Sequence, residues 1–309
     1  MRLTEEFQRT LPDIDLVVFD IDGVLIDTSE SFPEAIVKAV YRYGQLVDIP
    51  GWAKPAREAV AAFKRVPGFN NDWDLAEGLL VFNLINRTTN RNLSLDEFLT
   101  KVNTAGTGLA GVRNWITGLD TSEKREIGNL YDSGQIRQLA MEYYAGEEYC
   151  EQLYGFQPKY GISPGTIENE TLFVEADQLN SLRPEYELGI YTGRDPDETA
   201  VALQNIGFHG FNENCIVTDD GRSPTKPDPA PLMQMLEKTS GSGVMFVGDS
   251  LDDYNTITGF REVYNEIPAE FVQVSRELRP FEPGINIVST VEELIEVLIH
   301  SEETELEKP

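Results

Sequence analysis

The chain contains few cysteines and few histidines. Only two cysteines, Cys150 and Cys215, occur among 309 residues, and they lie far apart in the sequence. Two such thiols are better explained as buried and reduced than as a disulfide, and a lone pair of cysteines makes a poor metal site. The two histidines, His209 and His300, show no pattern of partners. The sequence therefore argues against a disulfide-stapled scaffold and against a cysteine-based metal centre.

Long apolar runs are also missing. No stretch approaches the ~18–20 apolar residues that a bilayer-spanning helix needs, and the segment from Met1 to Glu6 lacks the apolar stretch of a signal peptide. A hydrophobic content of 40% and an aromatic content of 10% are those of an ordinary globular protein. We expect a cytoplasmic protein without membrane association, built as one large domain or two smaller ones.

Positive charge is scarce. The chain has 25 basic and 53 acidic residues, which gives a net charge of −28, and only 9 of the basic residues are lysines. This balance disfavours binding to nucleic acid or to anionic membranes, because both need clustered basic residues. It suits either a high-salt cytoplasm, where salt screens the charges, or a protein that is simply acidic, and both interpretations stay open. The sequence leaves the oligomeric state open as well.

The most informative segment runs from Leu16 to Val24. Its first four residues, Leu16–Phe19, are apolar and partly β-branched, which predicts a strand buried on both faces. Asp20 and Asp22 follow, and Gly23 allows a sharp turn. Two crowded carboxylates at the end of a buried strand are costly unless a cation or a proton satisfies them, and Mg²⁺ prefers such oxygen ligands. An Asx-rich turn is the alternative interpretation.

Two later segments repeat this arrangement of an apolar strand followed by polar residues. Glu187–Tyr191 leads into Thr192-Gly193-Arg194, and Val244–Val247 leads into a stretch with several aspartates. Lys226 lies between them, just before a helical pattern. Ligands of open α/β sheets bind outside the carboxyl ends of the strands. That edge would hold a nucleophile, an acid, a hydroxyl, a lysine and extra carboxylates, which together are suited to phosphoryl transfer. Lys226, and Arg194 or Arg222, would attract the phosphate locally.

These residues resemble the four motifs of the haloacid dehalogenase superfamily. Asp20-x-Asp22-Gly-Val is similar to its first motif, Thr192 to its second, Lys226 to its third, and Gly248-Asp249-x-x-x-Asp253 to its fourth. The resemblance covers about residues 1–27 and 164–300. It implies a doubly wound, Rossmann-like parallel sheet, and the core is most similar to the phosphoglycolate phosphatase-like members of subfamily I.

The resemblance also implies residue roles. Asp20 would be the nucleophile, forming an aspartyl-phosphate, and Asp22 the general acid and base. Thr192, the Gly193 N–H and Lys226 would bind the phosphoryl oxygens. Mg²⁺ would be the cofactor. Its ligands would be the carboxylates of Asp20 and Asp249 and the backbone carbonyl of Asp22, while Asp253, the fourth member of the metal set, would order metal-bound water or Lys226. Asp252 stands where relatives often have asparagine, which leaves its role open.

A large insertion separates the first motif from the second. From Asp20 to Thr192 the chain runs 172 positions, but from Thr192 to Lys226 only 34, which fits one helix and one strand. The inserted part reads as helical, and in the resembled superfamily it would be a cap domain, here residues 28–163. Its helices are predicted at Ser31–Tyr43, Pro55–Arg65, Trp73–Ile85, Leu95–Val102 and Thr121–Tyr144. Ser163-Pro164-Gly165 is a candidate hinge, and 301–309 an acidic, frayed tail.

One stretch of this cap, Phe69–Asp74, is unusually rich in polar and aromatic residues. In one interpretation Asn70, Asn71 and Asp72 lie in a loop that contacts the leaving group of the substrate. In the other, Asn71 or Asp72 is the N-cap of a helix, and Trp73 packs inward. The two interpretations are compatible.

The resemblance implies a Mg²⁺-dependent phosphatase acting on a small phosphorylated metabolite. Phosphoglycolate is one candidate substrate, and histidinol phosphate or a sugar phosphate are others. A dehalogenase would not need Asp22, and a phosphonatase would need a cap lysine such as Lys54 or Lys64 for a Schiff base. A phosphomutase shares every core motif and stays open as an alternative. So does a catalytically idle scaffold, although none of the motif carboxylates is missing.

Overall fold

The chain forms two compact units. The computed structural model describes residues 1–69, 71–89 and 91–306, apart from the side chains of 301–306. A core unit contains the residues up to Thr28 and from Thr171 onward, and a helical unit contains Ser29–Glu170. The sequence analysis expected the chain to return to the core at Ser163–Gly165, but these residues still belong to the helical unit. The return comes later because the 3₁₀ helix η2 (Thr166–Asn169) packs against helices of that unit.

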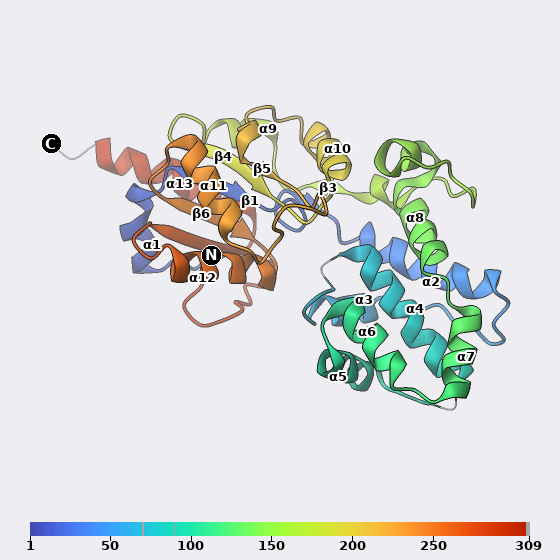
Figure 1. The fold of residues 1–309 in the computed structure, drawn as a ribbon. Helices are drawn as coiled ribbons and strands as arrows, with labels where there is room; N and C mark the ends of the chain where they lie inside the picture. Colours follow the sequence, from blue (N-terminus) through green and yellow to red (C-terminus); the bar gives the residue numbers. More distant parts are fainter. Residues whose placement is uncertain (70, 90, 307–309) are drawn as a thin grey trace. The chain divides into compact units, whose positions relative to one another are not determined.

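A six-stranded parallel sheet is the centre of the core unit (Figure 1). Its strand order is β5-β4-β1-β6-β7-β8, so β1 lies between β4 and β6. The strands are β1 (Leu16–Phe19), β4 (Glu187–Tyr191), β5 (Ile216–Val217), β6 (Val244–Gly248), β7 (Ala269–Val274) and β8 (Asn286–Val288). This arrangement confirms the predicted doubly wound α/β fold.

Both faces of the sheet are buried, as the apolar strands predicted. Along β1, Val17 and Phe19 belong to the hydrophobic cluster on one face, whereas Leu16 and Val18 belong to the cluster on the other. Successive side chains of a strand point to opposite faces, so a strand covered on both sides must be apolar throughout. The first cluster includes residues of α1 (Glu5–Thr10), α9 (Ala176–Asn180), α10 (Pro196–Ile206) and α13 (Val291–Leu306), and the second includes residues of α11 (Ala230–Thr239) and α12 (Leu251–Val263).

The helical unit consists of helices joined by short loops (Figure 1). A cluster of stacked and edge-on aromatic rings, including Phe32, Trp73 and Tyr144, packs its first, third and last helices together. The helices are α2 (Phe32–Leu46), α3 (Glu58–Lys64), α4 (Asp72–Thr88), α5 (Leu95–Ala105), α6 (Gly108–Thr117), α7 (Thr121–Leu130) and α8 (Ser133–Tyr154).

One prediction for this unit was wrong, and one helix was missed. The segment Thr121–Tyr144 is not one helix, because α7 ends at Leu130 and α8 begins at Ser133. Asp132 lies between them in an extended conformation, and its side chain accepts a hydrogen bond from Gln135 N as the N-cap of α8. Helix α6 was not predicted, since it is short and contains Gly108 and Gly111, which weaken a helical pattern.

The chain enters and leaves the core unit through a two-stranded antiparallel ribbon. It pairs β2 (Ile26–Asp27) with β3 (Thr171–Leu172). Arg276 contacts Asp27 of β2 and Phe173, the residue directly after β3. Its Nη2 lies 2.6 Å from Asp27 Oδ2, and its guanidinium carbon lies 4.7 Å from the ring centroid of Phe173. An ion pair and a cation–π contact therefore connect the ribbon to the segment that follows β7.

The carboxyl-terminal segment also differs from expectation. Helix α13 continues to Leu306, whereas a frayed tail was predicted from residue 301. Glutamate and leucine are good helix formers, and neither glycine nor proline interrupts 301–306. Both cysteines are buried and free, as predicted. Among the described helices, none combines the length and the apolar character that a bilayer crossing requires.

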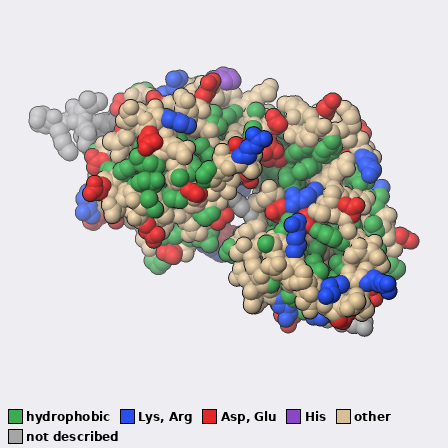
Figure 2. Space-filling model, in the orientation of Figure 1, with side chains coloured by type: hydrophobic (Ala, Val, Ile, Leu, Met, Phe, Trp, Pro, Cys, Tyr) green, Lys and Arg blue, Asp and Glu red, His purple; other side chains and the backbone are tan. Residues whose placement is uncertain are grey.

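The negative charge is unevenly divided between the units. More than half of the 25 basic residues, but only about a third of the 53 acidic residues, lie within Ser29–Glu170. The core unit is therefore strongly acidic, and Figure 2 shows acidic side chains distributed over its visible face. A phosphate that binds to this unit must be held by specific nearby cations, because the general field repels it.

Candidate active site

Three predicted motifs meet at the carboxyl edge of the sheet. Within the parallel pairs, Phe19 of β1 lies opposite Ile190 of β4 and Val247 of β6. The loops that begin with Asp20, Thr192 and Asp249 therefore leave the sheet side by side. The topology thus brings together residues that are more than 170 positions apart in sequence.

Lys226 binds two of the predicted carboxylates. Its Nζ lies 2.9 Å from Asp20 Oδ2 and 2.7 Å from Asp253 Oδ1, and its side chain is only 3% exposed. Burial opposes the charged ammonium, but Asp20 and Asp253 outweigh this effect and raise the pKa of Lys226. The lysine is therefore a permanent cation. It also lies 5.7 Å from the centroid of the Phe246 ring beneath it.

The surroundings of Asp20 disfavour its charged form. Burial and the nearby charges of Asp253 and Asp22 raise its pKa to about 7, although Lys226 pulls in the opposite direction. The charge of Lys226 therefore does not outweigh burial and the neighbouring carboxylates together. Asp20 Oδ1 also accepts a hydrogen bond of 2.7 Å from Ile21 N, which fixes the orientation of the carboxylate.

Asp253 has both carboxylate oxygens engaged. Oδ1 accepts from Lys226 Nζ, while Oδ2 accepts from Asp249 N, Ser250 N and Ser250 Oγ at 3.2, 2.9 and 2.7 Å. Ser250 Oγ in turn accepts from Asp253 N, so the two residues form the capping box of α12. These contacts agree with one of the two roles that the resemblance implies for Asp253, the ordering of Lys226, and they also hold the Asp249 loop.

The cluster of carboxylates from Asp20, Asp249 and Asp253 is suited to binding a hard divalent cation. One carboxylate oxygen each from Asp20, Asp249 and Asp253 lies within 4.8 Å of the others. The Asp249 carboxylate packs directly on Gly23, where a Cβ would lie 2.0 Å from Asp249 Oδ2 and where φ is +74°. Desolvation at this position, together with Asp253 and Asp20, raises the pKa of Asp249 well above its usual value. The carboxylates are crowded, and the ionised forms of Asp20 and Asp249 are disfavoured. A divalent cation bound between them would compensate their negative charge.

Thr192 and Gly193 form the neighbouring loop. Thr192 is buried, its N–H donates to Val217 O at 3.0 Å, and its Oγ1 accepts from Arg194 N at 3.2 Å. Gly193 is exposed between them. The loop is therefore tied to β5 on one side, and the predicted phosphate-binding N–H of Gly193 lies on its accessible part.

Arg194 makes a close contact at this edge that the sequence did not predict. Its guanidinium donates to Asp22 Oδ1 from both Nε and Nη2, at 2.9 and 2.7 Å. The sequence analysis placed Arg194 near a substrate phosphate and did not foresee a bond to Asp22. The sequence feature that could have indicated this bond is the position of Arg194 directly after Thr192-Gly193, in a loop beside the Asp20 loop.

The sequence matches a protein-family model across both units. A family model described as haloacid dehalogenase-like hydrolase matches residues 14–258, most of the chain. The chain belongs to this family of hydrolases. The search of curated proteins found no match.

Two solved structures are similar to this chain. A phosphatase from Thermococcus thioreducens, Tt82, is 26% identical with a TM-score of 0.66, and the alignment covers 92% of this chain and 99% of that one. A candidate phosphoglycolate phosphatase from Lactobacillus delbrueckii subsp. bulgaricus is 14% identical with a TM-score of 0.55, covering 93% and 98% of the two chains. The second likeness concerns the fold alone.

The predicted cap residues of this hydrolase have structural partners in the helical unit. Asn71 is the N-cap of α4, because its Oδ1 accepts from Trp73 N and Asp74 N at 3.0 and 3.1 Å. Trp73 packs inward and is 7% exposed. Asp72 forms an ion pair of 2.9 Å with Lys64. The helix-cap interpretation is confirmed, contact with substrate stays a prediction, and Asn70 lies outside the described residues.

Replacing Asn71 by alanine should destabilise the hydrolase. Loss of an N-cap side chain typically costs about 1 kcal/mol, because two N–H groups of the first helical turn lose their acceptor. Urea unfolding of Asn71→Ala should show this loss, whereas Asn71→Ser, which can still cap the helix, should stay close to the wild type. If Asn71→Ser kept the stability but lost activity, a substrate contact would be the better explanation.

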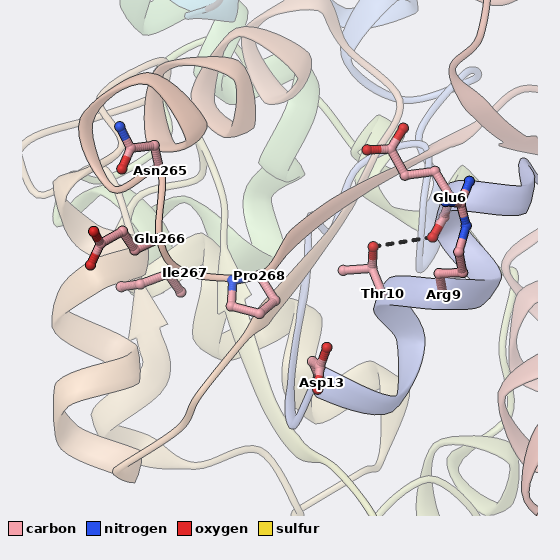
Figure 3. Close-up of a pocket in the computed structure, with 8 residues that line it drawn as sticks. All are labelled: Glu6, Arg9, Thr10, Asp13, Asn265, Glu266, Ile267 and Pro268. Carbon is pink, nitrogen blue, oxygen red and sulfur yellow. Dashed lines mark hydrogen bonds between the residues drawn. The ribbon is translucent and has the colours of Figure 1, made fainter.

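A polar hollow of this hydrolase lies at the opposite edge of the sheet (Figure 3). It is lined by the segments before β1 and before β7, including Glu6, Arg9, Asp13 and Pro268. Figure 3 shows Thr10 bonded within α1 to Glu6. The motif residues lie after the carboxyl ends of the strands, so this hollow is separate from the candidate active site.

Proposed function

We propose that this hydrolase is a phosphatase that hydrolyses a small phosphomonoester through an aspartyl-phosphate on Asp20. The observation that carries the proposal is the buried Asp20–Lys226–Asp253 group, with Asp249 and Asp22 beside it. A nucleophilic carboxylate held by a fixed cation next to a second acid is suited to in-line displacement at phosphorus. The phosphatase from Thermococcus thioreducens, similar along 92% of the chain, supports the same reaction class.

The first step transfers the phosphoryl group to the enzyme. A carboxylate oxygen of Asp20 attacks phosphorus as the bond from phosphorus to the ester oxygen breaks. Asp22 gives its proton to the departing oxygen, which leaves as an alcohol. Lys226 already binds Asp20, and the ammonium has a third N–H that can donate to a phosphoryl oxygen.

The second step returns the enzyme to its starting state. Asp22, now a carboxylate, accepts a proton from a water molecule whose oxygen attacks phosphorus. The bond from phosphorus to Asp20 breaks, and inorganic phosphate leaves. Thr192 Oγ and the Gly193 N–H are the neighbouring donors for phosphoryl oxygens, and they carry this role by the family resemblance.

Mg²⁺ is the proposed cofactor. Its ligands would be the carboxylates of Asp20 and Asp249 and the backbone carbonyl of Asp22, while Asp253 would hold Lys226 in place. When bound, the cation neutralises negative charge on the carboxylates and on the phosphoryl group. The crowding that raises the pKa of Asp20 and Asp249 supports this assignment.

Added Mg²⁺ should raise the melting temperature of the wild type. A cation at a concentration 100 times its Kd stabilises the folded state by about 2.7 kcal/mol, which for a unit of this size corresponds to roughly 5–10 °C. The shift should disappear in EDTA and should be much smaller in Asp249→Asn. An equal shift in both proteins would place the cation elsewhere.

The direct test of function is hydrolysis of p-nitrophenyl phosphate, with and without EDTA. We expect Mg²⁺-dependent release of p-nitrophenol. A panel of small phosphomonoesters, with phosphoglycolate, histidinol phosphate and sugar phosphates included, would then identify the substrate from the highest kcat/KM. A protein with no turnover of any ester in Mg²⁺ would be an idle scaffold, and a product that is an isomer of the substrate would identify a mutase.

A further inference from the structure

The bond between Arg194 and Asp22 joins two motif loops by their side chains. Nε and Nη2 of Arg194 both donate to the same oxygen, Asp22 Oδ1, at 2.9 and 2.7 Å. The Arg194 side chain is only 1% exposed, whereas that of Asp22 is 32% exposed. The arginine is therefore the fixed partner within the core unit, and the aspartate is the one that can reach a ligand.

The backbone of Arg194 is anchored on both sides. Its N–H donates to Thr192 Oγ1 at 3.2 Å, and its carbonyl accepts from Asp219 N at 2.9 Å, which ties it to the loop after β5. A buried guanidinium is costly unless it is paired with a carboxylate. The backbone of Arg194 is thus fixed by its bonds to Thr192 and Asp219, and its side chain is fixed by the ion pair with Asp22.

We propose that Arg194 is a positioning residue for Asp22, which it holds by one oxygen so that the other oxygen faces the leaving group. This inference rests on the proposed function. Two donors that converge on Oδ1 hold that oxygen more firmly than one donor would, and because the carboxylate is planar and joined to the chain through Cβ, a fixed Oδ1 also sets the direction of Oδ2. Oδ2 then carries the proton that passes to the ester oxygen as its bond to phosphorus breaks.

The alternative is that Arg194 binds the phosphoryl group itself, the role that the sequence suggested. The two roles differ in how they depend on the leaving group. Proton donation matters most when the leaving oxygen is strongly basic, as in an alkyl phosphate, and very little for 2,4-dinitrophenyl phosphate, whose phenolate leaves without a proton. Binding of the phosphoryl group is needed equally for both esters.

The experiment compares kcat/KM for an alkyl phosphate and for 2,4-dinitrophenyl phosphate. General acids contribute ~10²–10⁴-fold, so Arg194→Ala should lose about 100-fold on the alkyl ester and less than about threefold on the dinitrophenyl ester. Arg194→Lys keeps the charge but cannot place two N–H groups in the same fork, and it should show the same selective loss. It also serves if the alanine variant does not fold.

Two controls make the result specific. Arg261→Ala removes another arginine of the core unit, which binds Ala269 O and Glu270, and any effect it has should be equal on both esters. Asp22→Asn should reproduce the selective loss, and adding Arg194→Ala to it should cause little further loss on the alkyl ester, because the arginine acts through Asp22.

Equal losses on the two esters, together with weaker inhibition by inorganic phosphate, would overturn the inference and make Arg194 a phosphate-binding residue. Additive losses in the Asp22→Asn background would overturn it as well. Failure of the proposed function looks different, since the wild type would then hydrolyse neither ester in Mg²⁺.

Discussion

Replacing Asp20 by asparagine should abolish turnover without unfolding the protein. Asparagine has the same shape but cannot form an acyl phosphate, so kcat/KM should fall by at least about 1,000-fold, the scale expected when a covalent nucleophile is removed. The measurement is hydrolysis of p-nitrophenyl phosphate in saturating Mg²⁺. Activity within about threefold of the wild type would exclude Asp20 as the nucleophile.

The same variant should be at least as stable as the wild type when both are measured in EDTA. Burial raises the pKa of Asp20 from 3.8 to about 7 in the folded protein, so ionised Asp20 costs stability. The penalty is absent below the unfolded pKa, grows as the pH rises towards the folded pKa, and is constant above it. Asp20→Asn removes this penalty, and the difference in melting temperature should follow that pH dependence. A large loss of stability at neutral pH would mean that the contact between Lys226 and Asp20 outweighs the crowding.

Replacing Lys226 by methionine should have the largest effect on stability. The lysine is the cation between Asp20 and Asp253, and Asp253 is completely buried. Removing one partner of a buried ion pair typically costs about 3–5 kcal/mol, because the other charge is left uncompensated. Activity should be lost as well, since the positive charge at the phosphoryl site disappears. Urea unfolding at neutral pH measures the first effect.

A second substitution separates charge from packing in this experiment. In Lys226→Met with Asp253→Asn, the buried charge is removed together with its partner, and much of the lost stability should return. Lys238→Met is the matched control, because Lys238 is exposed and its Nζ donates to Asn214 O at 3.1 Å. Its change should be within about 0.5 kcal/mol. Equal destabilisation in the single and the double variant would show that Lys226 acts by packing alone.

The core fold could be predicted because its signals are local. Leu16–Phe19, Glu187–Tyr191 and Val244–Val247 are short apolar runs, each followed by polar residues, and a parallel sheet must bring their carboxyl ends together. The helices of Ser29–Glu170 were predicted less well. Where α7 ends and α8 begins depends on the cap at Asp132, which gives only a weak signal in a continuous helical pattern.

The partners of individual side chains could not be predicted in the same way. The resemblance offered Lys226 as a partner of Asp253, but sequence spacing could not say that the second oxygen of Asp253 binds Asp249 and Ser250, or that Arg194 turns to Asp22. Those choices depend on which donors the fold brings within hydrogen-bond distance. The boundary after Glu170 depends on tertiary packing of η2, which leaves no mark in composition.

The most direct measurement of the central claim is chemical trapping of the phosphorylated enzyme. Borohydride reduces an acyl phosphate to an alcohol, so enzyme quenched during turnover should contain a reduced side chain that peptide mass spectrometry can locate. We predict reduction at Asp20, dependent on substrate and absent from Asp20→Asn. Reduction at Asp22 or Asp249, or continued phosphate release with no reduced carboxylate at any position, would contradict the account.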